Sequence, residues 1–207
     1  MSGGSDGCGC GACHPQDENA SEPASFARRE WLLTALAAGV ASALPDAAVA
    51  GDPKAIRPQE GDQFVYVAGE RQGEVIAPAD LVGKPPVFAW PMDPANRILR
   101  DGSRLNQVLL VHVGEDALDE ETRARAAGGV VAYSASCTHA LCPVTGWKAE
   151  QKILKCHCHN SEYDPRLAAK VVFGPAPRPL PALPLRLADG ALVAAGPFIG
   201  RVGHASG

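Results

Sequence analysis

Two stretches decide the fold and the chemistry of this chain: Cys137-Thr138-His139-Ala140-Leu141-Cys142 and, further on, Cys156-His157-Cys158-His159-Asn160-Ser161-Glu162-Tyr163-Asp164. Each contains a cysteine and a histidine at a spacing typical of metal ligands, C-x-H in the first and C-x-x-H in the second. Each also contains an additional cysteine. Thiolate and imidazole are common ligands of zinc and iron in proteins. The two stretches therefore predict a metal centre that is built from two separate loops.

The spacing of these residues resembles the Rieske iron–sulfur family, and the match is specific around the ligand positions. The resemblance implies that Cys137 and Cys156 bind one iron of a 2Fe–2S cluster as thiolates, while His139 and His159 bind the other iron through imidazole. Neutral imidazoles in place of two thiolates remove negative charge around one iron, so that iron accepts an electron more readily. Reduction potentials in the family accordingly run from roughly −150 to +300 mV, against about −400 mV for plant-type ferredoxins. The resemblance thus implies one cluster that carries single electrons.

The resemblance also implies roles for four neighbouring side chains. Cys142 and Cys158 are expected to form a disulfide between the two loops, as in quinol-oxidising and periplasmic members and unlike Rieske ferredoxins and ring-hydroxylating oxygenases. Such a bond persists only in an oxidising compartment. The hydroxyls of Ser161 and Tyr163 are expected to hydrogen-bond a bridging sulfide and a ligand thiolate, which raises the potential. We therefore expect a potential in the upper half of the family range.

Three positions depart from the family pattern. Leu141 and Asn160 stand where the family usually has glycine, and His157 stands where it usually has proline. Asparagine tolerates a left-handed backbone almost as glycine does, whereas leucine is strained there if φ is positive. The first loop is therefore expected to have a different shape. The segment 174–177, Gly-Pro-Ala-Pro, does follow the pattern and resembles the proline loop that covers the cluster.

A structural zinc site is the main alternative for the same four ligands. Two cysteines and two histidines are legitimate zinc ligands, but zinc explains neither the second cysteine pair nor the two hydroxyls. A domain that has lost its cluster is a further alternative, although every ligand is present. His112 and His204 lie outside the two loops and His157 is not at a ligand position, so we interpret these three as structural or surface residues.

Residues 1–50 are interpreted as a disordered N-region followed by an export signal. The pair Arg28-Arg29 precedes a mildly apolar stretch, Trp31 to Leu44, as in twin-arginine signals. As a helix that stretch would cover roughly 21 Å, short of a ~30 Å hydrocarbon core. Ala48-Val49-Ala50 supplies small residues for a signal peptidase, so cleavage is expected after Ala50. The alternatives are an uncleaved signal retained as a membrane anchor and an ordinary amphipathic helix with a chance arginine pair.

Three further cysteines, Cys8, Cys10 and Cys13, lie near the start of the chain, where Cys10 to His14 matches the C-x-x-C-H pattern of c-type haem attachment. This motif lies on the cytoplasmic side of the expected signal, whereas haem attachment takes place on the far side. We therefore interpret it as a thiol-rich tail that could chelate metal transiently. The role of its cysteines stays open.

After residue 50 the chain changes to short runs of β-branched and aromatic residues bounded by glycine, proline and aspartate. A hairpin turn is predicted at 188–190, and segment 175–184, with its five prolines, is predicted to be an irregular loop. The runs predict eight strands, at 64–67, 87–90, 108–113, 130–133, 152–155, 170–173, 183–187 and 191–194.

One exposed helix is predicted between Asp116 and Ala127. Asp116 would cap its first turn and Gly128 would stop it, with two i,i+4 ion pairs along it, Asp119–Arg123 and Glu121–Arg125. The predicted fold is all-β: a small antiparallel β-sandwich or barrel over residues 51–207, with an inserted cluster-binding subdomain at about 135–180.

These features predict a periplasmic electron-transfer subunit. The net charge of −4 and the lack of a basic block argue against nucleic acid as a partner. A 2Fe–2S cluster has no open coordination position for substrate, so no catalytic residue is assigned and the chemistry is expected on a partner. The run 130–139 and the segment 155–164 resemble arsenite oxidase small subunits, which implies a catalytic, molybdopterin-containing partner and a cytochrome or cupredoxin as the second partner.

The alternative role is the Rieske subunit of a cytochrome bc-type complex, which oxidises quinol. A quinol-oxidising subunit must be anchored in the membrane, so the weak apolar segment near the N-terminus favours the first role. A third class, an exported redox sensor, would require Cys142 and Cys158 to cycle while the cluster stayed intact. The partner's substrate cannot be named from this sequence.

Overall fold

The computed structural model describes residues 51–203, and the statements below concern that part of the chain. The expected export signal with its cleavage site, the three N-terminal cysteines and His204 lie outside the described residues. Residues 51–203 form two antiparallel sheets connected by turns and loops. In this range no helix combines the length and the apolar character that crossing a bilayer requires.

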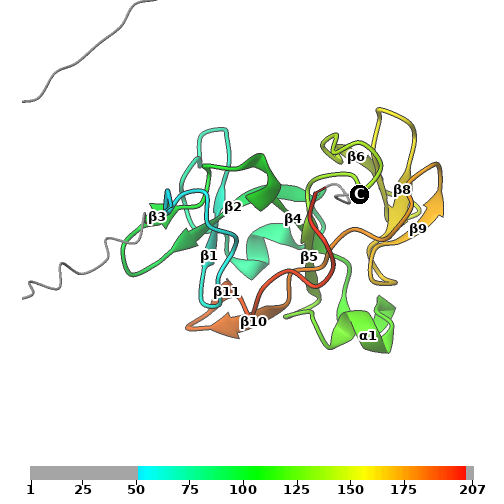
Figure 1. Ribbon diagram of the computed structural model, residues 1–207. Coiled ribbons are helices and arrows are strands. Elements are labelled where there is room, and N and C mark those ends of the chain that lie inside the picture. Colours follow the sequence, from blue (N-terminus) through cyan, green and yellow to red (C-terminus); the bar gives the residue numbers. More distant parts are fainter. Residues whose placement is uncertain (1–50, 204–207) are drawn as a thin grey trace, which may run out of the picture. The chain divides into compact units, whose positions relative to one another are not determined.

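The larger sheet has seven strands, paired antiparallel in the order β10-β11-β1-β2-β4-β5, with β3 beside β2 (Figure 1). Strands β10 and β5, the two ends of this order, contact each other, so the sheet curls into a half-barrel. The strands are β1 Gln63–Tyr66, β2 Val87–Asp93, β3 Ile98–Leu99, β4 Val108–His112, β5 Val130–Ser134, β10 Leu185–Ala188 and β11 Ala191–Ala194.

Strand β4 is buried on both faces, which explains its nearly continuous apolar sequence. Successive side chains of a strand point to opposite faces. Leu109 and Val111 accordingly join one buried apolar cluster, while Val108 and Leu110 join another. Full burial of each such side chain contributes on the order of 2 kcal/mol. The larger sheet is therefore held by two apolar layers, one on each of its faces.

The smaller sheet is inserted between β5 and β10 and has four strands in sequential order, β6-β7-β8-β9. Its strands are β6 Gly146–Lys148, β7 Ile153–Lys155, β8 Glu162–Asp164 and β9 Lys170–Phe173. Leu154 and Tyr163 pack into the same apolar cluster as Leu109 and Val111. One face of the small sheet is thus buried against the larger sheet. The loops before β6 and between β7 and β8 lie at the end of the small sheet, where they can form a binding site.

The predicted all-β fold is confirmed, and the predicted strands match strands of the structure within a few residues. Three strands were not predicted: β3, β6 and β8. The hairpin between β10 and β11 is confirmed, with Asp189 and Gly190 both at positive φ, 49° and 77°. Two successive residues with positive φ match the right-handed twist of paired strands.

The predicted helix at 116–127 is wrong in length and cap. The segment forms a 3-10 turn at Glu115–Ala117 and then one α-helical turn, α1, at Glu120–Arg123. Asp119, not Asp116, caps α1, and its side chain accepts the Thr122 N–H at 2.8 Å.

Tertiary contacts explain this early end of α1. The Thr122 hydroxyl accepts the backbone N–H of Ala168 at 2.7 Å, and the carbonyl of Arg125 accepts the N–H of Leu185 in β10 at 2.9 Å. Beyond Arg123 the chain follows these contacts, and the N–H groups of residues 125 and 126 bond carbonyls three residues back rather than four. The predicted Glu121–Arg125 ion pair is present at 2.6 Å. In place of the predicted pair with Asp119, the Arg123 side chain donates to two backbone carbonyls.

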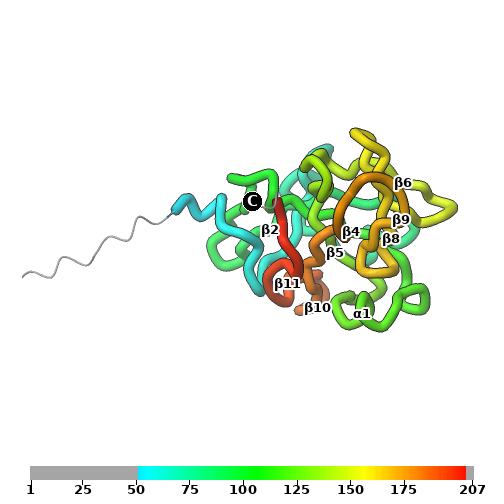
Figure 2. Tube along the Cα trace, turned by 45° about the vertical axis from the view of Figure 1, so that its right-hand side comes forward, coloured from blue at the N-terminus to red at the C-terminus, as the bar shows by residue number. Residues whose placement is uncertain are grey.

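Segment 175–184 contains no strand, as its prolines predict, and runs along the C-terminal segment (Figure 2). Ala182 forms isolated β-bridges to Tyr133 on one side and to Ile199 on the other. The proline-rich segment is therefore tied to both the larger sheet and the end of the described chain.

Candidate metal centre

The first ligand loop follows β5 and closes on itself through backbone hydrogen bonds. The N–H of Cys137 donates to the carbonyl of Cys142 at 2.8 Å, and the N–H of Leu141 donates to the carbonyl of Cys137 at 2.9 Å. Ser136 and Pro143 form a β-bridge at the neck of the loop. These bonds hold the backbone of the loop between residues 137 and 142.

The second ligand loop joins β7 to β8, which pair antiparallel with Leu154 opposite Tyr163. At the loop neck the N–H of Cys156 donates to the carbonyl of Ser161 at 2.8 Å. Asn160 lies at φ 61°, and asparagine is one of the few residues besides glycine that visits this region routinely. The expectation that this change from glycine is mild agrees with its backbone.

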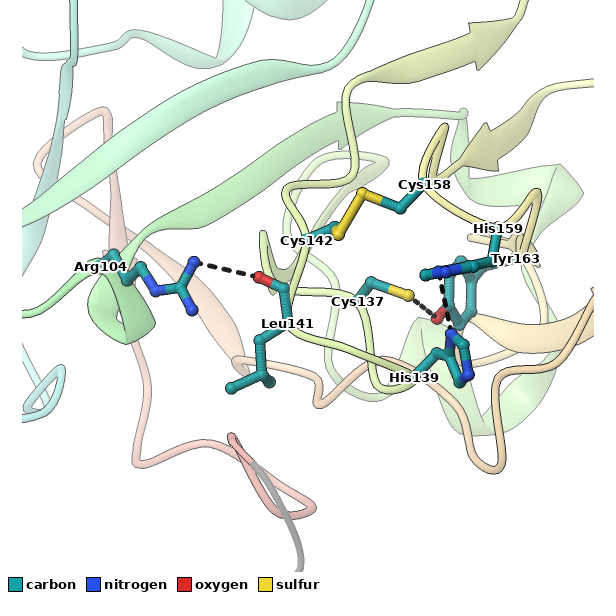
Figure 3. The surroundings of a disulfide bond; sticks show 8 residues. All are labelled: Arg104, Cys137, His139, Leu141, Cys142, Cys158, His159 and Tyr163. Carbon is teal, nitrogen blue, oxygen red and sulfur yellow. Dashed lines mark hydrogen bonds between the residues drawn. A yellow bond between two sulfur atoms is a disulfide. The ribbon is translucent and has the colours of Figure 1, made fainter.

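The two loops bring the predicted ligands together; Figure 3 shows three of them, Cys137, His139 and His159. Cys137 and Cys156 are buried free thiols. The Nδ1 atoms of His139 and His159 lie 3.2 Å apart, with the two rings nearly perpendicular. The histidine rings lie at the exposed end of the site. The assignment of these four side chains as ligands stays a prediction, and their placement supports it.

Cys142 and Cys158 form a disulfide that links the two loops (Figure 3). The sulfur atoms of Cys142, Cys156 and Cys158 lie within 4.8 Å of one another. Two of these sulfurs are bonded to each other and cannot act as thiolates, so Cys156 is the only metal ligand this trio supplies. Proximity alone would have suggested a three-cysteine site, and the covalent bond excludes it.

Tyr163 of β8 contacts a predicted ligand directly. Its hydroxyl oxygen lies 3.1 Å from the Cys137 sulfur and accepts the Thr138 N–H at 3.3 Å. Burial alone would raise the pKa of Cys137, but hydrogen bonds from Tyr163 and from backbone N–H groups hold that pKa below its usual value. Burial raises the pKa of Cys156, and burial together with the Cys137 sulfur raises the pKa of Tyr163. The tyrosine therefore stays protonated at neutral pH and can donate to sulfur.

Ser161 provides a test of whether these residues fit a 2Fe–2S cluster. Its hydroxyl is buried and has no hydrogen-bond partner in the described part of the chain. A buried hydroxyl without a partner costs free energy, so such groups in native proteins call for an explanation. A bridging sulfide would supply the missing acceptor. Two buried thiols, two facing imidazoles and one unpartnered hydroxyl together fit the cluster.

Gly174 explains why the proline loop can lie close to the second ligand loop. Its φ is 89°, and an added Cβ would meet the Ser161 Cα at 2.6 Å and the Asn160 oxygen at 2.7 Å. Backbone at this distance cannot move aside as a flexible side chain could. Only glycine therefore fits at this contact.

Leu141 does adopt the strained backbone that its sequence position suggested, with φ 58°. Its carbonyl accepts a long hydrogen bond of 3.4 Å from Arg104, which belongs to the 3-10 turn Arg104–Asn106 (Figure 3). A non-glycine residue in this region costs of order 1–3 kcal/mol and persists where its surroundings hold it. The strain that the sequence suggested at Leu141 is therefore present, and the expected difference in loop shape stays a prediction.

His157 and His112 have neighbours other than the two facing imidazoles. His157 is exposed, and an added Cβ on Gly146 would meet its Nε2 at 2.7 Å, so its ring covers that glycine. His112 ends β4, paired with Val130 of β5. These positions agree with structural roles.

Comparison with known proteins settles the family. Residues 105–184 match the family model of the Rieske [2Fe-2S] domain. A protein of Haloferax mediterranei, provisionally named a respiratory nitrate reductase subunit Rieske, is 33% identical over 98% of this chain and 94% of its own length. This chain belongs to the Rieske family. It therefore carries a 2Fe–2S cluster and acts as an iron–sulfur electron-transfer subunit.

Other Rieske proteins match a smaller share of this chain. The cytochrome bc1 complex Rieske iron–sulfur subunit of Corynebacterium diphtheriae is 47% identical over 79 residues, which cover 38% of this chain and 20% of that protein. Among solved structures, the plasma membrane Rieske protein of Synechocystis is 24% identical, over 57% of this chain and 93% of that chain, with a TM-score of 0.39.

Proposed function

We propose that this protein is an exported Rieske subunit that passes single electrons between a catalytic respiratory oxidoreductase and a cytochrome or cupredoxin. One observation carries the proposal: the two predicted thiolate ligands are buried, whereas the two predicted imidazole ligands face each other at the exposed end of the same site. A 2Fe–2S cluster bound there supplies a one-electron redox centre. The chain's own residues then determine where electrons leave and enter.

The exposed imidazoles offer a short route to a docked partner. His159 lies on the surface and His139 is half-buried beside it, so a second protein can approach their ring edges within contact distance. Cys137 and Cys156 are about 1% exposed and are shielded from solvent and from other oxidants. Electron exchange is therefore directed to the histidine end of the site.

We choose between the two candidate partners by how much of this chain each group of relatives matches. The Haloferax mediterranei protein, named for a respiratory nitrate reductase, matches along nearly the whole chain. The bc1 subunits of two Corynebacterium species match over 79 residues, 38% of this chain. This supports a catalytic oxidoreductase as the partner, and the resemblance to arsenite oxidase small subunits adds molybdopterin as its expected cofactor.

A cytochrome bc-type complex is the second candidate partner, and one observation favours it. Identity to the Corynebacterium diphtheriae bc1 subunit reaches 47% over 79 residues, above the 33% of the relative that matches along nearly the whole chain. If that similarity reflects a shared docking surface, the chain would exchange electrons with quinol through the same exposed histidines.

Export to the periplasm is supported by two independent features. The Cys142–Cys158 disulfide requires an oxidising compartment to persist, and the Arg28-Arg29 pair before a short apolar stretch is typical of a twin-arginine signal. Retention of the uncleaved signal would leave the domain attached to the membrane surface.

The test has two arms. Purified full-length protein should contain two irons and two acid-labile sulfides and, once reduced, give an EPR signal with average g below 2; a single zinc without sulfide would overturn the electron-carrier role. Affinity purification of the tagged chain from its native host should then recover stoichiometric molybdenum. Recovery of b-type haem without molybdenum would contradict the first partner and support the second.

A further inference from the structure

Arg178 contacts both the C-terminal segment, residues 195–203, and the first ligand loop. It lies in the proline-rich segment 175–184, and its guanidinium donates to two backbone carbonyls, those of Arg201 and, at 2.6 Å, of Gly203. A guanidinium presents its N–H groups in a rigid planar fork, so two acceptors on one segment fix its orientation. Arg178 therefore holds the proline-rich segment to the end of the described chain.

The main chain of the same residue points toward the cluster loops. The Arg178 carbonyl accepts the Thr138 hydroxyl proton at 2.6 Å. Thr138 is buried and lies between two predicted ligands, Cys137 and His139. A threonine hydroxyl has only one proton to donate. That proton is committed to Arg178, which fixes the rotamer of Thr138 and with it the backbone between the two ligands.

Thr138 in turn contacts the tyrosine that tunes a ligand. Its N–H donates to the Tyr163 hydroxyl oxygen at 3.3 Å, and its own hydroxyl oxygen also lies 3.3 Å from that atom. The Tyr163 oxygen accepts the Thr138 N–H and keeps its own proton to donate, and the Cys137 sulfur lies 3.1 Å from that oxygen. A continuous set of hydrogen bonds thus runs from the C-terminal segment to a predicted ligand.

We infer that Arg178 is a positioning residue for the cluster. Its guanidinium, bound to the carbonyls of residues 201 and 203, holds the Arg178 carbonyl in the place where it orients Thr138. Through Thr138 it maintains the hydrogen bond between Tyr163 and Cys137, and with it the reduction potential. The inference rests on the electron-carrier role proposed above. It adds a function for the C-terminal segment, which lies beyond the residues matched to the family model.

Two simpler roles must be separated from positioning. Arg178 could act only through its positive charge, or it could only stabilise the fold. Arg178→Lys keeps the charge but cannot form the fork, whereas Arg178→Gln loses both. Thr138→Val removes the hydroxyl while keeping the shape. Arg186→Gln is the matched control, because Arg186 is an exposed arginine on β10 outside this set of hydrogen bonds.

The experiment measures the reduction potential of each full-length, cluster-loaded variant, together with amide hydrogen exchange across residues 137–140. Arg178→Lys and Arg178→Gln should both lower the potential, in the direction expected for loss of the tyrosine hydrogen bond. Both should also speed exchange of these amides about tenfold, the effect of one lost charge-assisted hydrogen bond. Arg186→Gln should change neither. In a double-mutant cycle, Arg178→Lys should add no further shift to Thr138→Val, because both break the same connection.

Three results would overturn the inference. An Arg178→Lys protein with the reduction potential and the amide exchange rates of the wild type would show that the positive charge alone accounts for the effect of Arg178. If the Arg178 variants had a lower melting temperature and an unchanged reduction potential, Arg178 would only stabilise the fold. Additive shifts in the cycle would mean that Arg178 acts by a route other than Thr138. Failure of the proposed function looks different, since the wild-type protein itself would then lack iron and acid-labile sulfide.

Discussion

The two sheets of this domain are stabilised in different ways. The larger sheet has apolar clusters on both faces of its central strands. The smaller sheet has strands of three or four residues, and its edge strand β9 leaves Val172 and Phe173 49% and 61% exposed. It is secured by local bonds, among them a disulfide and the Lys148–Glu162 ion pair at 2.6 Å. Buried apolar area stabilises the larger sheet on both faces, whereas the smaller sheet has one buried face and depends in addition on individual bonds.

Removing one predicted thiolate would break the smaller sheet's site without unfolding the larger sheet. Cys156→Ser should abolish cluster binding, because a serine hydroxyl is a poor ligand for iron, while the far-UV circular dichroism stays close to that of the wild type. Iron and acid-labile sulfide analysis measures the loss. Thr145→Ser, at an exposed position in the same region, is the control and should keep its cluster. Full iron content in Cys156→Ser would disprove its role as a ligand.

A substitution in the core of the larger sheet should have the opposite result: it should lower the stability of the fold and leave the reduction potential of the cluster unchanged. Leu110→Ala, in β4 and fully buried, should lower the free energy of unfolding by about 2–5 kcal/mol, as measured by denaturant titration. The potential of the folded fraction should not move. Leu187→Ala, at a half-exposed position on β10, should cost no more than about 0.5 kcal/mol. Equal losses at both positions would contradict the two-layer description of the core.

A smaller effect separates two buried tyrosines. Tyr163→Phe should keep the cluster but lower the potential by roughly 60 mV, which equals a tenfold change for one electron, because the Cys137 sulfur loses a donor. Tyr133→Phe is the matched control, since the Tyr133 hydroxyl donates to the Pro165 carbonyl at 2.7 Å. It should lower stability and leave the potential unchanged. Protein-film voltammetry measures both; an unmoved potential in Tyr163→Phe would refute the hydrogen-bond argument.

The smallest effect concerns strain in the first ligand loop. Leu141→Gly should raise the free energy of unfolding of the cluster-loaded protein by about 0.5–1 kcal/mol, because glycine adopts positive φ at no steric cost. Leu187→Gly, in an extended strand, should have the opposite sign. Denaturant titration of both variants checks the prediction, and a destabilised Leu141→Gly would mean that side-chain packing outweighs backbone strain there.

The fold was largely predictable because its strands are short, apolar and bounded by turn residues. The missed strands lack that signature: β6 is Gly-Trp-Lys, and β8 begins with Glu162, whose charge is paired with Lys148. The helix at 116–127 was overpredicted because its local pattern is helical, whereas contacts of Thr122 and Arg125 with distant residues end it after one turn. Such contacts leave no local sequence signal.

The candidate site was predicted at the level of residue types and spacing. Cysteine and histidine at fixed separations carry that information directly, and the structure gathers all four predicted ligands. Arg104 and Arg178 were not predicted to contact the site, since they lie 37 and 40 residues from the loop atoms they reach. Their participation depends on tertiary structure, and one arginine in a sequence resembles any other.

The closeness of the Cys156 sulfur to the disulfide has a consequence for the order in which the protein matures. A free thiol within 4.8 Å of a bonded sulfur pair is placed for exchange, in which a thiolate attacks a disulfide and a new pairing results. Iron bound to Cys156 would remove that sulfur from such exchange. We therefore expect that loading the metal before oxidation protects the Cys142–Cys158 pairing.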